Sequence, residues 1–195
     1  MKKLLTFLIA AAIAASMVAC STADKSSSQS VSSESSVSES SASSELSSEQ
    51  SPEDFKIPEE NKKLGDIINA ARPAEFNEYY PAILSKDDPQ AQMMSDVTGI
   101  KYDDMKAFAL SASAMNTKAY AVAILQPAEG KAESVLKSAN AFVEAQKKAF
   151  EQYLPDQKDI ANAATVDTLD DGTVVLVMCE GSADVQKAIL TALKK

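Results

Sequence analysis

A serine-rich stretch from Ser21 to Pro52 limits how much of this 195-residue chain can fold. Apolar residues in the stretch are few and isolated, and acidic residues are scattered among the serines. Such a composition cannot bury enough apolar surface to offset the entropy lost on ordering. We therefore predict a disordered tether over residues 20–52, either a plain spacer or a glycosylated stalk. One folded domain over residues 53–195 follows, long enough to bury a core without disulfides or metals.

The first residues of the chain are typical of an export signal. Lys2 and Lys3 precede an uncharged apolar run, Leu4–Val18. The run is shorter than the roughly 20 apolar residues that a bilayer-spanning helix needs, and it shows no amphipathic stripe of the kind a core helix would need. A basic start, a short apolar core and small residues before a cleavage site describe a secretory signal peptide. We predict this signal peptide over residues 1–19.

The sequence Met17-Val18-Ala19-Cys20 resembles the lipobox of bacterial lipoproteins. The resemblance implies that the Cys20 thiol receives a diacylglyceryl group and becomes the mature N-terminus. The chain would then be anchored to the lipid bilayer at the outer face of the cytoplasmic membrane. Each buried CH₂ of an acyl chain contributes about 0.8 kcal/mol, and two chains hold far better than one. The alternative is ordinary cleavage near Ala19, which leaves Cys20 as a free thiol.

Composition argues against several classes of function. A net charge of −9 is unfavourable for nucleic-acid binding and for lying flat on an anionic membrane. The chain has no histidine, which removes Ser-His-Asp and Cys-His catalysis and histidine-based zinc sites. If Cys20 is lipidated, Cys179 has no intramolecular partner, and we expect a buried thiol at the end of a strand. We expect no cofactor and no bound metal.

Apolar residues at helical spacing predict several helices in the domain. Segment 76–84 also carries apolar side chains, but Pro81 leaves its form open. The expected helices are residues 64–71, ended by Arg72-Pro73; residues 87–98, begun by Asp87-Asp88-Pro89 and ended by Gly99; residues 132–153, ended by Pro155; and residues 182–193, capped by Ser182.

Alternating apolar residues predict four strands, at residues 106–114, 119–126, 163–169 and 173–179. Asp171-Gly172 is a strong hairpin signal, and the last strand is so continuously apolar that we expect it at the centre of the sheet. The first two strands each alternate bulky with small residues. We expect one small-residue face that either packs closely under a helix or stays open to a partner, formed by Ala107, Ala109, Ala119, Ala121 and Ala123.

The order of these elements predicts an α+β fold. An antiparallel four-stranded sheet, in ββα-ββα order, would carry the helices on one side and follow a helical N-terminal segment. The stretch from Ala121 to the helix at Val135 is weakly similar to the stretch from Val174 to the helix at Val185. Internal duplication and similar composition both remain open as explanations.

Residues 64–193 resemble the small secreted lipoproteins of Gram-positive bacteria that carry an uncharacterised domain. The resemblance implies an exported α+β domain with no accepted catalytic residues. It rests on packing and turn motifs: Ala112–Met115 with Asn116, the helix at Val135, Tyr153-Leu154-Pro155 with Gln157, and the hairpin Val166–Gly172 that leads into Val175-Leu176-Val177.

Several residue groups invite a chemical interpretation. The acidic pairs Asp87-Asp88, Asp103-Asp104 and Asp170-Asp171 are typical of helix starts and turns, and no calcium-binding loop is present. Adjacent acids do not provide the two facing carboxylates that glycoside hydrolysis needs. Methionine fills irregular gaps in a core and also adapts to partner surfaces. We expect the following methionines to lie in the core: Met93, Met94, Met105 and Met115.

An aromatic group is the candidate partner surface: Phe76, Tyr79, Tyr80 and Tyr102. These side chains either line a groove for a peptide or glycan or simply cover one end of the sheet. We expect a non-enzymatic, membrane-anchored interaction module whose partner is an envelope protein or glycan. The alternatives are a carboxylate-dependent hydrolase of cell-wall glycan and a small solute-binding lipoprotein, although the latter class is usually longer and two-lobed.

Overall fold

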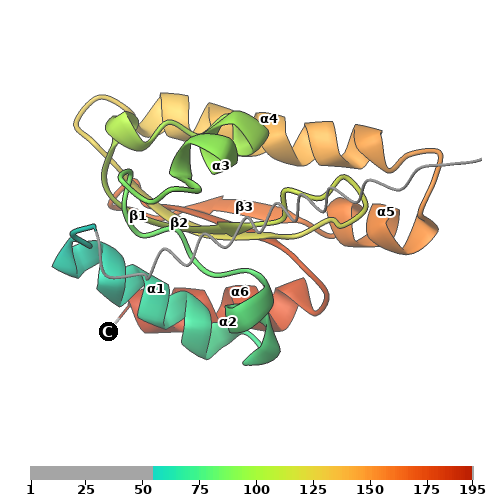
Figure 1. The fold of residues 1–195 in the computed structure, drawn as a ribbon, viewed down its shortest axis with the longest axis horizontal. Helices are drawn as coiled ribbons and strands as arrows, with labels where there is room; N and C mark the ends of the chain where they lie inside the picture. Colours follow the sequence, from blue (N-terminus) through green and yellow to red (C-terminus); the bar gives the residue numbers. More distant parts are fainter. Residues whose placement is uncertain (1–54, 195) are drawn as a thin grey trace, which may run out of the picture. The chain divides into compact units, whose positions relative to one another are not determined.

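The computed structural model of the chain describes residues 55–194 (Figure 1). The expected signal peptide, the lipidation residue Cys20 and the tether lie outside these residues. The elements, in chain order, are α1 (Glu59–Ala71), α2 (Glu75–Tyr79), α3 (Ala91–Thr98), the 3-10 turn η1 (Tyr102–Asp104), β1 (Met105–Ala112), β2 (Ala121–Pro127), α4 (Ala132–Ala149), α5 (Pro155–Asn162), β3 (Thr165–Thr168), β4 (Val174–Met178) and α6 (Ser182–Leu193).

The four strands form one sheet in the order β1-β2-β4-β3, and every neighbouring pair is antiparallel. The predicted α+β class, the strand order along the chain and the central position of β4 are confirmed. All five residues of β4 are buried, because this strand has a neighbour on each edge and helices over each face.

Helices cover both faces of the sheet, so the expectation of helices on one side was wrong. α3 and α4 lie on one face, whereas α1, α2 and α6 lie on the other (Figure 1). Two apolar clusters result, one on each face. A strand that is apolar on both faces requires cover on both. α4 and α6 lie on opposite faces, so the two ββα units are not related by a rotation about the centre of the sheet.

The register of β1 and β2 removes the expected single small-residue face. Ala109 pairs with Ile124, and Ala123 pairs with Leu110. Ala107 and Ala109 therefore face α1, whereas Ala119, Ala121 and Ala123 face α4. Ala109 and Ala123 thus lie beside bulky residues of the other strand, whereas Ala121 lies beside Ala112 of β1 and Met178 of β4. All five alanines are buried and offer no open surface.

Local signals misplaced the starts of α1 and α3, the end of α4 and the cap of α6. α4 ends at Ala149, and Pro155 opens a further helix, α5, that the sequence pattern did not predict. Proline is well suited to the first turn of a helix, where no backbone N–H is needed. Ser182 does not cap α6, because its hydroxyl donates to the Ala163 carbonyl at 3.2 Å. Within residues 55–194, no helix is both long and apolar enough to cross a membrane.

Candidate functional site

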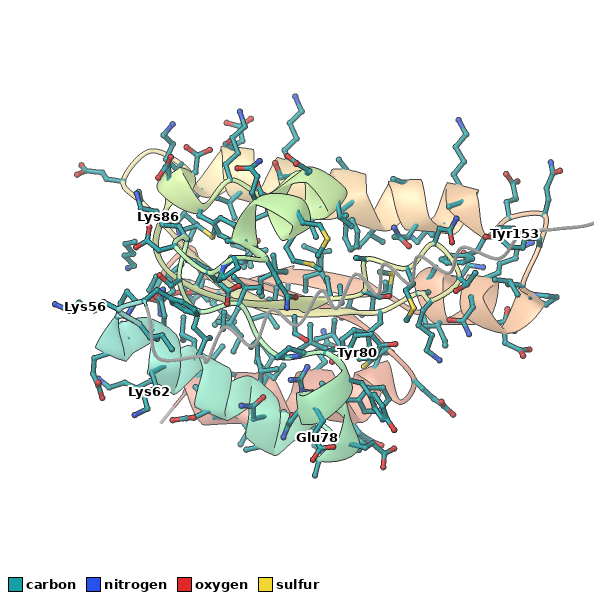
Figure 2. The ribbon with its side chains drawn as sticks, in the orientation of Figure 1. Lys56, Lys62, Glu78, Tyr80, Lys86 and Tyr153 are labelled. Atoms are coloured by element: carbon teal, nitrogen blue, oxygen red, sulfur yellow. The ribbon has the colours of Figure 1, made fainter. Side chains whose placement is uncertain are left out.

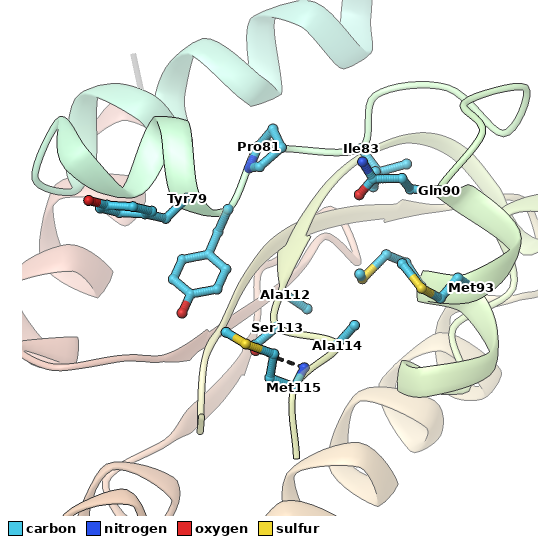
Figure 3. Close-up of a pocket in the computed structure, with 11 residues that line it drawn as sticks. Tyr79, Pro81, Ile83, Gln90, Met93, Ala112, Ser113, Ala114 and Met115 are labelled. Carbon is cyan, nitrogen blue, oxygen red and sulfur yellow. Dashed lines mark hydrogen bonds between the residues drawn. The ribbon is translucent and has the colours of Figure 1, made fainter. Parts of the chain in front are cut away.

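A groove opens where the end of α2, the helix α3 and the end of β1 meet (Figure 3). Its volume is about 180 Å³, and none of its lining residues carries a charged side chain. We call it the α2–α3 groove. It is lined by Tyr79, Tyr80 and Pro81 after α2, by Ile83, by Gln90, Met93 and Met94 of the α3 region, and by Ala112, Ser113, Ala114 and Met115 at the end of β1.

One wall of the groove is the helix α3. The turn before it is closed by the Asp88 carboxylate, which accepts a hydrogen bond from the Gln90 N–H at 2.7 Å. The helix ends at Gly99, whose φ of +69° is the left-handed conformation that glycine adopts without strain. Met93 and Met94 are adjacent in α3, so their side chains point in different directions. Met94 is buried in the core, whereas Met93 is 45% exposed.

The opposite wall is the loop after β1. The Ser113 hydroxyl accepts a hydrogen bond from the Met115 N–H at 3.1 Å (Figure 3). Two contacts from the segment around α5 hold the far side of the loop. Tyr153 donates to the Asn116 carbonyl at 2.9 Å, and the Gln157 side chain accepts from the Ala119 N–H at 2.9 Å. These contacts bring together two motifs that carried the family resemblance, the one near residue 116 and the one at residues 153–157. They hold the loop that carries Met115.

Exposed apolar side chains gather at this groove. Six large apolar residues are exposed among residues 55–194, and three of them line the groove. Tyr79 is 74% exposed, Met93 45% and Met115 57%. The expectation that the four methionines belong to the core was therefore wrong for Met93 and Met115. Buried and exposed methionines have the same spacing signal, so only the packing separates them.

The base of α2 is fixed by a buried arginine. Arg72 is 6% exposed, and each of its five guanidinium hydrogens has an acceptor. The acceptors come from α1, from α2 and the residue after it, from β1, and from the residue just before β2. They are the side-chain oxygens of Asn77 (2.8 Å), Ser111 (2.6 Å), Tyr120 (2.5 Å) and Asn69 (3.0 Å), and the Tyr80 carbonyl (3.0 Å).

No carboxylate pairs with Arg72 among the described residues. Its charge instead lies at the C-terminal ends of α1 and α2, where helix dipoles favour a cation. The sequence pattern indicates Arg72 only as the end of a helix. Pro73 after it supplied that signal, whereas the acceptors at Ser111 and Tyr120 are distant in sequence and were not predictable as its partners.

The aromatic residues of the predicted partner surface do not form one surface. Phe76 and Tyr80 stack on Tyr120, with ring centroids 5.4 Å and 4.2 Å from it. In Figure 2, Tyr80 lies between α2 and the sheet, whereas Glu78 lies on the outer side of α2. Tyr79 is exposed at the groove. Tyr102 packs separately, on Phe108 at 4.6 Å in the cluster under α4.

Burial is the largest cause of the raised pKa of three side chains near these elements: Cys179, Tyr120 and Tyr102. Burial raises the pKa of the Cys179 thiol to about 11, and a thiol with a raised pKa is a poor nucleophile. Burial also raises the pKa of Tyr120, although the Arg72 guanidinium acts in the opposite direction. Burial, together with the Asp88 carboxylate, raises the pKa of Tyr102, whose hydroxyl has no hydrogen-bond partner among the described residues.

The acidic pairs take up capping, turn and ion-pair roles. Asp103 pairs with Lys86 at 3.1 Å and Asp104 with Lys131 at 2.9 Å, and the latter contact lowers the pKa of Asp104. Hydrogen bonds from Thr173 lower the pKa of Asp171 in the hairpin. Among residues 55–194, no group of three or more acidic or cysteine side chains is arranged to hold a metal ion.

Comparison with known proteins identifies part of the chain. Residues 84–179 match the model of a family described as a domain of unknown function, DUF4358. The match includes the whole sheet, α3, α4 and α5, and it leaves out α1, α2 and α6. No curated protein and no solved structure matches the chain. The chain thus carries a DUF4358 domain, a domain of unknown function, between residues 84 and 179.

Proposed function

We propose that this chain is a lipid-anchored binding module on the outer face of the bacterial cytoplasmic membrane, with no catalytic chemistry of its own. The observation that carries the binding role is the gathering of Tyr79, Met93 and Met115, all exposed, around one groove. Exposed apolar side chains that cluster at a concave site are typical of interaction surfaces. Scattered single apolar residues on a surface would carry no such meaning.

A protein segment suits this groove better than a glycan. The lining is mostly aliphatic, aromatic and methionine side chains, with no charged group to bind sugar hydroxyls. The engaged acidic pairs likewise support binding over glycan hydrolysis, because Asp103 and Asp104 each pair with a lysine. The partner class that we propose is therefore an envelope protein.

The membrane anchor is proposed from the sequence Met17-Val18-Ala19-Cys20. Its test is fractionation of cells that express the full chain or its Cys20→Ala variant. We expect the parent chain in the membrane fraction and the variant in the soluble or secreted fraction. Equal release of both chains would exclude the anchor.

The groove is tested by cross-linking in cells that express the full chain. A photoreactive residue placed at Met115 should yield a discrete protein adduct, and Met93→Gln should reduce that adduct. The matched control is Val97→Gln, because Val97 is one turn along α3, is 38% exposed and does not line the groove. An adduct that both variants weaken equally, or no adduct at all, would contradict a binding role for the groove.

A further inference from the structure

β1 is an outer strand of the sheet, and the chain itself covers part of its free edge. Along an antiparallel strand, the backbone groups of every second residue point away from the paired neighbour. In β1 these outward positions are Phe108, Leu110 and Ala112, because Ser113, at an odd position, donates its N–H inward to the Tyr120 carbonyl.

Other parts of the chain bond to the first two outward positions, and this cover then stops. The Asn61 side chain accepts the Phe108 N–H at 2.9 Å. Ile83 exchanges both backbone hydrogen bonds with Leu110, at 2.7 and 3.1 Å. At Ala112 the covering segment would have to supply Pro81, which has no N–H to donate. The ladder therefore ends at Ile83, and among the described residues no hydrogen bond joins the covering segment to Ala112.

This unpaired end of the edge lies in the α2–α3 groove, since Ala112, Ser113 and Ala114 all line it; Ala112 is 7% exposed, and Ala114 is exposed. We propose that an extended segment of the protein partner adds to the sheet at Ala112 as a further strand. The inference deepens the proposed function and rests on it. Backbone hydrogen bonds to Ala112 would fix the segment, and alternate side chains would enter the groove. Unpaired outer edges are templates for such pairing.

The groove side chains suit apolar residues of varied shape. Met93 and Met115 face the groove from α3 and from the loop after β1, on opposite walls (Figure 3). Methionine is unbranched and adapts to different partner surfaces. Tyr79 adds a flat, exposed ring beside them.

The segments that form the groove walls carry more acidic than basic side chains outside the groove lining, so the partner segment should also carry positive charge. Glu75 and Glu78 lie on α2 beside Tyr79, and Asp88 bonds to Gln90 in the turn before α3. Lys118 is the base in the loop after β1, and Lys86 is already paired with Asp103. Complementary charge at the border of a site favours encounter and orientation, and salt weakens it.

The test uses the full chain, purified in detergent, and a synthetic probe peptide. The probe is an acetylated peptide of alternating valine and threonine, flanked by lysines and labelled with a fluorophore for anisotropy. We expect saturable binding that weakens at least tenfold when alternate amides of the probe are N-methylated. N-methylation keeps every side chain of the probe. It removes the amide N–H donors and puts methyl groups on the edge that would pair with β1. A probe flanked by glutamates should bind more weakly than the lysine probe at low salt.

Substitutions in the protein, rather than in the probe, test the same edge. Ala112→Pro removes the outward N–H and leaves the bonds of β1 to β2, and outer strands accept proline at such positions. We expect at least a tenfold loss of probe binding with an unchanged circular dichroism spectrum. Met93→Gln should also weaken binding, whereas Val97→Gln should not.

Each outcome decides the inference. Equal affinity for the methylated and unmethylated probes would overturn strand addition, and so would absence of any probe binding. Met93-dependent cross-linking in cells would then still support the groove as a binding site, so the two proposals can fail separately. If Ala112→Pro does not fold, the methylated probe still gives the answer, because it leaves the protein unchanged.

Discussion

The two faces of the sheet differ in the kind of side chain that is buried between the sheet and its helices. On the face under α4, the buried side chains are almost all apolar, and they include Phe108, Leu110, Leu176 and Phe142. The face under α1 also has an apolar cluster, but it ends in a buried guanidinium. Arg72 is the one charged side chain that is buried among residues 55–194.

This difference predicts different tolerance to substitution. An apolar cluster loses transfer and cavity energy in proportion to the volume removed, and it accepts swaps of similar volume. A buried hydrogen-bond network behaves otherwise, because removing one member deprives its buried partners of a hydrogen bond. On the face under α4, the loss of stability should therefore follow the side-chain volume that a substitution removes. At the Arg72 end of the α1 face, it should follow the hydrogen-bonding groups that a substitution removes.

The largest expected effect is that of Arg72→Ala. Five acceptors lose their donor, so we expect the free energy of unfolding to fall by about 3–5 kcal/mol. Urea denaturation of the full chain measures the loss. Arg72→Lys should recover little, because one ammonium group cannot reach acceptors spread around a planar fork. A loss near that of Lys63→Ala, which removes an exposed ion pair, would mean that the network does not support the fold.

The matching change on the face under α4 is Leu110→Ala. Leu110 is fully buried, and truncation should lower the free energy of unfolding by about 2–5 kcal/mol. Leu110→Met should cost less than about 1.5 kcal/mol, because the volume is kept. The same urea titration compares both variants. If Leu110→Met were as damaging as Arg72→Lys, the two faces would not differ in the way described.

A smaller effect is expected for Ser111→Ala, which removes one member of the network. The Ser111 hydroxyl accepts from Arg72 and donates to the Tyr80 carbonyl at 2.6 Å. Both partners would lose a bond, at a cost of about 1–3 kcal/mol in the free energy of unfolding. A double-mutant cycle with Arg72→Ala should show strong coupling, whereas a cycle of Leu110→Ala with Arg72→Ala should be close to additive. Additivity of Ser111 and Arg72 would argue that they act independently.

The smallest effect concerns the pH dependence contributed by Cys179, at the end of the α1 face. Burial raises the pKa of its thiol from an ordinary 9.0 to about 11. The folded protein then binds this proton more tightly than the unfolded chain does, so the contribution to stability is complete below about pH 9 and is lost as the pH rises through about 11. Melting temperatures across this range should fall less steeply for Cys179→Ala than for the parent chain. An identical slope for both chains would rule out the thiol as a contributor.

Local sequence signals predicted most elements of the fold but not all their limits. The four strands, the central position of β4 and the helix α4 follow from short-range periodicity and turn residues. The helix α5 was missed because Pro155 ends one helical pattern and begins another within a few residues. The alanines of β1 and β2 were assigned to one face because alternation within a strand does not give the register between strands.

The candidate site depends much more on tertiary structure. Tyr79 was named from sequence as part of a partner surface, and it does line the groove. Tyr102, named with it, lies in the cluster under α4. Met93 and Met115 were expected inside the core, because apolar spacing shows which residues share a helix or strand face and not whether another element covers that face.

The sequence alone determined the α+β class, the strand content and the absence of histidine chemistry, because these depend on composition and on contacts between near neighbours. Tertiary structure alone decided that helices cover both faces, that Arg72 finds acceptors on β1 and at Tyr120, and that the outward backbone groups of Ala112 are left unpaired at the groove. Each of these depends on residues about 30 or more positions apart meeting in space. Such meetings follow from the packing of the whole domain, and no local pattern in the chain encodes them.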